Sequence, residues 1–167
     1  MNALISQLVC MRHRLLCSGM ISACFFMSGH TMAFGKTLYL FSEVEGTVLL
    51  DGQPVSGAEV ERICHWKSEE KVERVLTDSS GRYSFFEITA KSFLWSFLPH
   101  EPVIFQLLRI RYQGKMHKGW VFTKHNYDPL GEVKDRQLKF VCELNSEPTA
   151  HPETETFGIC ILQQNDS

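Results

Sequence analysis

The sequence predicts an all-β domain, a Greek-key β-sandwich of about seven strands with one short helix or apolar loop. Short runs alternate apolar and polar residues, which is the two-residue period of strands with one buried face. Turn signals rich in Gly, Asp and Pro separate the runs about every 8–12 residues. Strands do not alternate with helical patterns along the chain, so a parallel α/β sheet is not expected.

The stretch 45–86 carries this pattern most clearly. Asp51-Gly52 is a hairpin signal followed by Pro54, and Asp78 to Gly81 forms a second turn. A charged connection, 67–71, separates the third and fourth runs. The strands expected in the first half are 36–42, 44–50, 58–66, 72–77 and 82–87.

The second half contains the one helical candidate, 88–100, which is rich in apolar residues and which Pro99 ends. An aromatic-packed loop is the alternative for this segment. Strand 103–112 is apolar on both faces, which indicates a central place in its sheet. A hairpin turn at Gln113 to Lys115 leads to strand 116–123, and the last full strand, 136–144, follows a loop at 124–135.

Residues 1–33 have the pattern of an export signal, and we expect 34–167 to form a single domain. Arg12 and Arg14 precede an apolar run from Leu15 to Met27, and small residues stand at Thr31 and Ala33 before a cleavage point. The first alternative is an uncleaved membrane anchor. The second is a lipoprotein, because small residues precede Cys24, which would then carry the lipid. All three place the domain outside the cytoplasm.

The cysteines outside this segment are Cys64, Cys142 and Cys160. An odd number in an oxidising compartment indicates one bridge and one free thiol. We expect a Cys142–Cys160 disulfide that ties the final apolar run to the last strand, with Cys64 as a small buried residue. Metal binding is the rival interpretation, but no cysteine pair has C-x-x-C spacing, so neither a metal nor another cofactor is predicted.

A family resemblance rests on two strings. Residues 45–60 read EGTVLLDGQPVSGAEV, and residues 77–85 read TDSSGRYSF. They resemble the carboxypeptidase-regulatory-like, transthyretin-like sandwich domains. The span 36–162 also resembles a bacterial family of exported single-domain proteins (DUF6795-like), with the hairpin Tyr112-Gln113-Gly114-Lys115 and the closing cysteine pair. The resemblance implies the fold and says little about function.

Large aromatic side chains are the candidates for a recognition surface. Burial in the core is the ordinary interpretation of such rings, and the alternative is a recognition surface, for which Trp95, Phe97, Trp120 and Tyr127 are the candidates. The histidines occur in no hydrolase or metalloprotease motif, so we expect a protein that is not an enzyme.

The function expected from these observations is that of an exported binding protein. A net charge of −2, without a basic cluster, argues against nucleic-acid binding. We expect a protein partner in the bacterial envelope, in the periplasm or outside the cell, and an immunity-type protein is one form of this role. A membrane association is expected only through an uncleaved signal or a lipid. The alternative function is a carbohydrate- or envelope-binding module that uses exposed aromatic rings.

Overall fold

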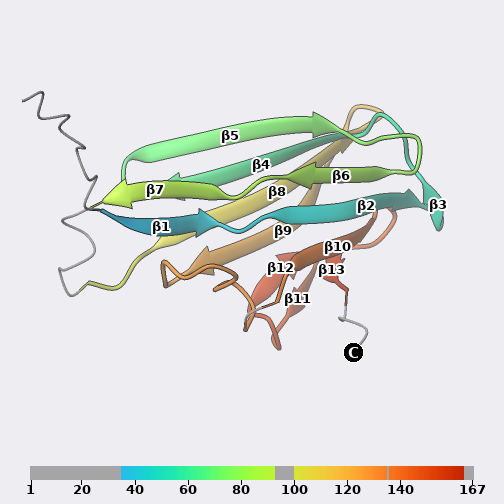
Figure 1. Ribbon diagram of the computed structural model, residues 1–167. Helices are drawn as coiled ribbons and strands as arrows, with labels where there is room; N and C mark the ends of the chain where they lie inside the picture. The colour runs from blue at the N-terminus through green and yellow to red at the C-terminus, as the bar shows by residue number, and fades with distance from the viewer. Residues whose placement is uncertain (1–34, 93–99, 135, 164–167) are drawn as a thin grey trace, which may run out of the picture. The chain divides into compact units, whose positions relative to one another are not determined.

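A computed structural model describes residues 35–92, 100–134 and 136–163 (Figure 1). Every regular element in those residues is a β-strand, which confirms the all-β class. The strands are β1 (Lys36–Phe41), β2 (Val44–Leu50), β3 (Gln53–Pro54), β4 (Glu59–Trp66), β5 (Glu69–Leu76), β6 (Arg82–Phe85), β7 (Ile88–Ser92), β8 (Ile104–Tyr112), β9 (Lys115–Lys124), β10 (Leu138–Glu143), β11 (Thr149–His151), β12 (Thr156–Gly158) and β13 (Cys160–Leu162).

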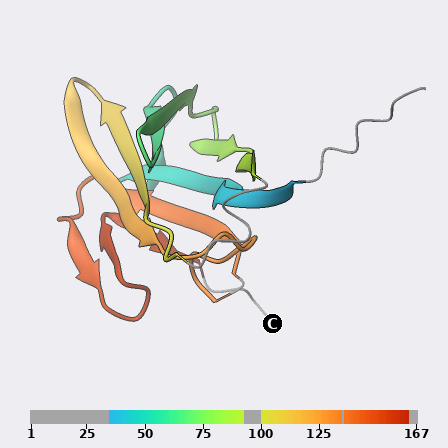
Figure 2. The ribbon, with the colours of Figure 1, turned by 90° about the vertical axis from the view of Figure 1, so that its left-hand side faces the viewer.

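Two main sheets pack face to face, and Figure 2 shows β8 and β9 in one layer and β2 and β10 in the other. One sheet has the order β11-β12-β9-β8-β4-β5. The other has the order β13-β10-β2-β3, with β6 also paired to β2. Strands β1 and β7 form a separate two-stranded sheet, and short connections join them to β2 and β6. Strands β2 and β10 pair in parallel, whereas the remaining pairs are antiparallel. The arrangement is that of a β-sandwich.

The core lies between the sheets because alternate residues of each strand point inward. Trp120 of β9 is at its centre, fully buried, with its ring centroid 5.4 Å from that of Phe140 and 5.8 Å from that of Phe41. These three rings come from different sheets, so they hold the layers together. The central place predicted for 103–112 is confirmed, since β8 pairs with both β4 and β9.

Two predicted elements differ from the structure. Strand β5 begins at Glu69 and not at Val72, because Lys67 and Ser68 alone make the turn, and Lys67 has a φ of 58°. The helix predicted for 88–100 is wrong in its first part, since Ile88–Ser92 forms β7 and pairs with β1. Backbone pairing along β1 outweighed the local apolar pattern there. Residues 93–99 lie outside the described residues.

The predicted disulfide is confirmed, because Cys142 and Cys160 are bonded and stand opposite each other in the β10–β13 pair. Cys64 is a buried free thiol, also as predicted, whereas Cys24 lies outside the described residues. Among the residues that the structure describes, no helix has the length and apolar character needed to cross a membrane.

Candidate interaction surface

The aromatic recognition surface predicted from the sequence does not form as a whole. Trp120 is 0% exposed, so its selection as a surface candidate is wrong and the ordinary interpretation, burial in the core, is correct. The inward direction of its position in β9 decided this, because the opposite face of the strand carries Val121. Trp95 and Phe97 lie outside the described residues.

Tyr127 is half-buried and held by two neighbours. Its hydroxyl accepts a hydrogen bond from Trp66 Nε1 at 3.1 Å and lies 3.1 Å from His100 Nε2. Its ring meets that of Trp66 edge-on, with centroids 6.0 Å apart. The backbone carbonyl of Tyr127 also accepts a hydrogen bond from the Tyr39 N–H. Tyr127 therefore fastens the 125–134 loop to the sandwich, and its hydroxyl is already engaged by two neighbours.

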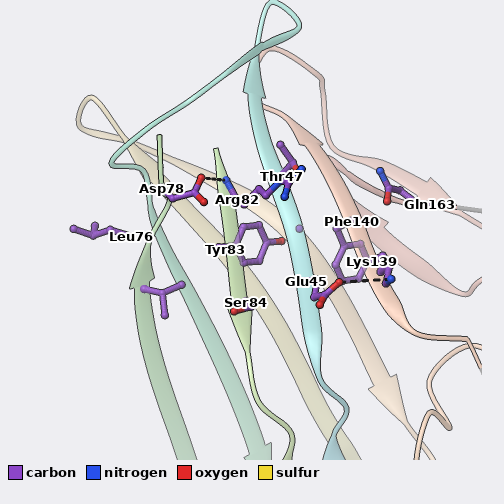
Figure 3. Close-up of a pocket in the computed structure, with 12 residues that line it drawn as sticks. Glu45, Thr47, Leu76, Asp78, Arg82, Tyr83, Ser84, Lys139, Phe140 and Gln163 are labelled. Atoms are coloured by element: carbon purple, nitrogen blue, oxygen red, sulfur yellow. Dashed lines mark hydrogen bonds and ion pairs between the residues drawn. The ribbon is translucent and has the colours of Figure 1, made fainter. Parts of the chain in front are cut away.

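A polar groove of about 670 Å³ runs across β2, β6, β10 and the end of β5 (Figure 3). Glu45 and Lys139 form an ion pair of 3.7 Å on its wall. Asp78 Oδ1 accepts hydrogen bonds from the N–H groups of Ser80 and Arg82 at 2.8 and 2.9 Å, so it shapes the turn. The lining residues include neither a histidine nor a cysteine. Nothing in this lining resembles a nucleophile with its base.

Tyr83, which also lines this groove, is a core residue. Burial raises the pKa of its hydroxyl, so Tyr83 stays protonated. The ring lies over Gly46, and the hydroxyl is 3.6 Å from Cys142 Sγ of the disulfide. Tyr83 thus packs the disulfide into the core, and the exposed lining of the groove combines charged and hydroxyl groups with the apolar side chain of Leu76.

The outer face of the six-stranded sheet has a different character. Strand pairing aligns one apolar residue from each of five strands into a continuous line, here called the apolar row. Its members are Val72, Ile63, Leu107, Val121 and Phe157. They lie outside the core cluster between the two sheets. Phe157 is 38% exposed, Val72, Leu107 and Val121 are half-buried, and Ile63 is buried at 7%. A line of apolar side chains across a sheet face that the sandwich does not cover is a typical protein contact surface.

A line of charges, the charged row, runs beside the apolar row on the same face. Arg74, Glu61, Arg109 and Lys118 stand opposite one another in register. Arg74 and Arg109 both pair with the Glu61 carboxylate. Burial opposes ionisation of Glu61, but hydrogen bonds and charge from the two arginines outweigh it and lower the pKa of Glu61. One carboxylate therefore holds two guanidinium groups in place.

The charged row carries more positive than negative groups. Arg74 and Arg109 are 57% and 40% exposed, and Lys118 Nζ lies 5.3 Å from the ring centroid of Phe157 in the apolar row. Arginines fixed by a carboxylate lose little rotational freedom when they bind, which favours contacts through them. The two rows together form a surface that suits an apolar partner edged with acidic groups.

Sequence reasoning missed this surface, although its signal was present. The run 103–112 is apolar on both faces, and the run 59–66 carries Ile63 among its outward residues. Along the chain, the second apolar face of 103–112 indicates only a central strand. Alignment of Ile63 with Leu107 and Val121 depends on the strand register, which pairs segments far apart in the chain.

No group of three or more His, Cys, Asp or Glu side chains that could hold a metal ion occurs within the described residues. The fold and the outer face together define a disulfide-containing β-sandwich domain with an exposed apolar and charged sheet face. Residues 44–147 match the family described as "Domain of unknown function (DUF6795)". The chain belongs to this family. No curated protein matches the chain.

Proposed function

We propose that this protein is an exported binding protein of the bacterial envelope, which acts by contact with a protein partner and performs no catalysis. Export is supported by the signal-like pattern of residues 1–33 and by the Cys142–Cys160 disulfide, a bond typical of oxidising compartments. We further propose that the domain is a relative of the carboxypeptidase-regulatory-like, transthyretin-like sandwiches, on the evidence of strings 45–60 and 77–85.

The observation that carries the proposal is the pair of rows on the outer face of the six-stranded sheet. Protein interfaces combine an apolar centre with polar margins, and arginine and aromatic residues are enriched in them. Here the apolar row supplies Leu107, Val121 and Phe157, and the charged row supplies Arg74 and Arg109 at its side. The partner expected from this chemistry presents apolar side chains bordered by Asp or Glu.

The test compares two outward-facing positions on opposite sheets. Leu107→Asp places a charge in the apolar row, and Val141→Asp makes the same change on the outer face of the other sheet, where Val141 pairs with Thr47. Each purified protein is immobilised and exposed to envelope extract, after circular dichroism has shown that it is folded. We expect wild type and Val141→Asp to retain the same partner and Leu107→Asp to lose it. If Leu107→Asp retained the partner and Val141→Asp lost it, the interface would lie on the sheet that contains β10, and the proposal would be wrong.

An immunity-type protein, which blocks a secreted toxin, is the narrower form of this proposal. It predicts a toxin gene beside this one and protection of cells that express both, and a genomic neighbourhood without a toxin gene would count strongly against it. Two of the rings named for the carbohydrate-binding alternative do not favour it, because Trp120 is buried and Tyr127 is held by Trp66 and His100. The third, Trp95, lies outside the described residues. Aromatic stacking on a sugar requires an open ring face.

A further inference from the structure

Strand β5 is the last strand of the six-stranded sheet and pairs only with β4 among the described strands. Figures 1 and 2 place it along the margin of the domain. Its eight residues form a regular strand, five of them exposed and Val72, Glu73 and Val75 half-buried, with Leu76 66% exposed. Such an edge offers unpaired backbone groups to another strand. We propose that β5 pairs antiparallel with β5 of a second copy of this chain, centred on Val72, so that the protein is a two-fold symmetric dimer.

The direction of the backbone groups allows this register. Lys67 and Ser68 form a two-residue turn, and such a turn is closed by a hydrogen-bonded pair, here Trp66 with Glu69. Hydrogen-bonded and non-hydrogen-bonded pairs then alternate along β4 and β5. Glu70, Val72 and Arg74 therefore direct their N–H and C=O groups away from β4, toward the free edge. Centring on Val72 places these residues opposite one another and forms about six backbone hydrogen bonds.

Charge complementarity selects this register over its neighbours. Centred on Val72, Glu70 of each copy faces Arg74 of the other, and Lys71 faces Glu73. A shift of one residue toward the N-terminus would place Lys71 opposite Lys71 and Glu69 opposite Glu73. A shift the other way would place Glu73 opposite Glu73. Like charges directly opposite in a sheet are destabilising, whereas opposite charges stabilise the pair.

The same register continues the apolar row. Val72 is the member of that row at the free edge, and it would stand directly opposite Val72 of the second copy. The apolar rows of the two copies would then meet at the two-fold axis and form one continuous line across the dimer. Edge charges usually protect a sheet against indiscriminate pairing. The charges of β5 alternate in sign on either side of Val72. This order favours the register centred on Val72 between two copies of β5 and opposes the neighbouring registers.

The inference does not depend on the proposed envelope partner, since it concerns the purified protein alone. Analytical ultracentrifugation over a concentration series should show a reversible monomer–dimer equilibrium. Glu70→Arg places two arginines opposite each other at both ends of the interface and should weaken the dimer roughly tenfold or more. Arg74→Glu should have the same effect through paired glutamates. Glu147→Arg, an equal charge change in the turn after β10, serves as the control and should leave the equilibrium unchanged.

A mixture of the two variants gives the decisive result. The Glu70→Arg chain and the Arg74→Glu chain are each repelled by their own copies, but together they restore opposite charges at both positions. We expect the mixture to form a heterodimer that neither variant forms alone as a homodimer. A wild-type protein that stays monomeric up to about 1 mM would overturn the proposal. So would variants that dimerise as wild type does.

A crosslink tests the register separately. Residues in a hydrogen-bonded antiparallel pair have Cα atoms about 5.5 Å apart, within the range that a disulfide spans. Val72→Cys should therefore form a disulfide-linked dimer under mild oxidation, and Arg74→Cys should not, because its own copy lies four residues further along the strand. Cys64 is buried and does not compete. Equal crosslinking of both variants, or of neither, would contradict pairing centred on Val72.

Discussion

The loop 125–134 is fastened by a buried ion pair whose removal should destabilise the domain strongly. The side chains of Glu132 and Lys124 are both 0% exposed, and Lys124 Nζ lies 3.2 Å from Glu132 Oε1. The Glu132 carboxylate also accepts hydrogen bonds from Ser42 N at 2.9 Å, Ser42 Oγ at 2.7 Å and Gln106 Nε2 at 2.9 Å. Glu132→Gln preserves the shape of the side chain, removes its charge and replaces one acceptor oxygen with an NH2 donor.

The expected loss is about 3 kcal/mol in the free energy of unfolding. The reason is the uncompensated ammonium group of Lys124, whose remaining contact is a hydrogen bond to the Asp128 carbonyl at 2.7 Å. Removal of one partner of a buried pair costs about 3–5 kcal/mol. The lower end applies because burial already lowers the pKa of Lys124, so this group can lose its proton in the variant. Domains of this size have total stabilities of about 5–15 kcal/mol.

Urea denaturation followed by tryptophan fluorescence measures the change. The midpoint should fall with an unaltered slope. The control is Glu45→Gln, which breaks the exposed 3.7 Å pair between Glu45 and Lys139 and should cost less than about 1 kcal/mol. A Glu132→Gln variant within about 1 kcal/mol of wild type would refute the reasoning.

The pH dependence provides a second measurement. Burial by itself would raise the pKa of Glu132, but the Lys124 charge and the hydrogen bonds from Ser42 and Gln106 hold the pKa below its ordinary value. The unfolded chain has the ordinary pKa of about 4.3, so the stabilisation is complete above that pH. It is lost as the pH falls through the lower folded-state pKa. The stability difference between wild type and Glu132→Gln should therefore shrink in acid.

Three further predictions follow from the core. Replacement of Cys142 and Cys160 by Ala should lower the free energy of unfolding by about 3 kcal/mol, and added reductant should then have no further effect in urea denaturation. Gly46→Ala should cost about 1–3 kcal/mol in a thermal melt, because its Cβ would lie 2.5 Å from the Tyr83 ring; an unchanged melting temperature would contradict that contact. Burial raises the pKa of Cys64 to about 11, so a thiol reagent at pH 8 should label it in urea and not in the native protein.

Local pattern predicted most of the strands, and it failed where partners come from far away in the chain. The alternation in 103–112 and the turn at Asp78 to Gly81 are properties of neighbouring residues, and both were identified correctly. The Glu132 network was not predicted, because Ser42 and Glu132 are 90 positions apart and neither belongs to a recognisable motif. Strands β11 and β12 were also missed, since they are three residues each and β12 joins the sheet by pairing with β9, far away in the chain.

The residues of the candidate surface also depend on partners far away in the chain. Trp120 was chosen for its size, and only the inward face of β9 in the folded sheet decided that it packs with Phe140 and Phe41. The apolar row could not be found along the chain, because its members come from five strands. Its existence depends on register, and a shift of one residue in any strand would turn that strand's members to the other face.

The sequence by itself determined the all-β class, the two main turns and the identity of the bridged cysteines. These follow from the two-residue period, from residues that favour turns and from the number of cysteines outside the export pattern. The tertiary structure alone decided which aromatic rings are buried, which charges form pairs inside the domain, and which side chains share the outer face. The physical reason is that burial and charge pairing depend on the distance between segments in space, whereas a strand's period depends only on its own residues.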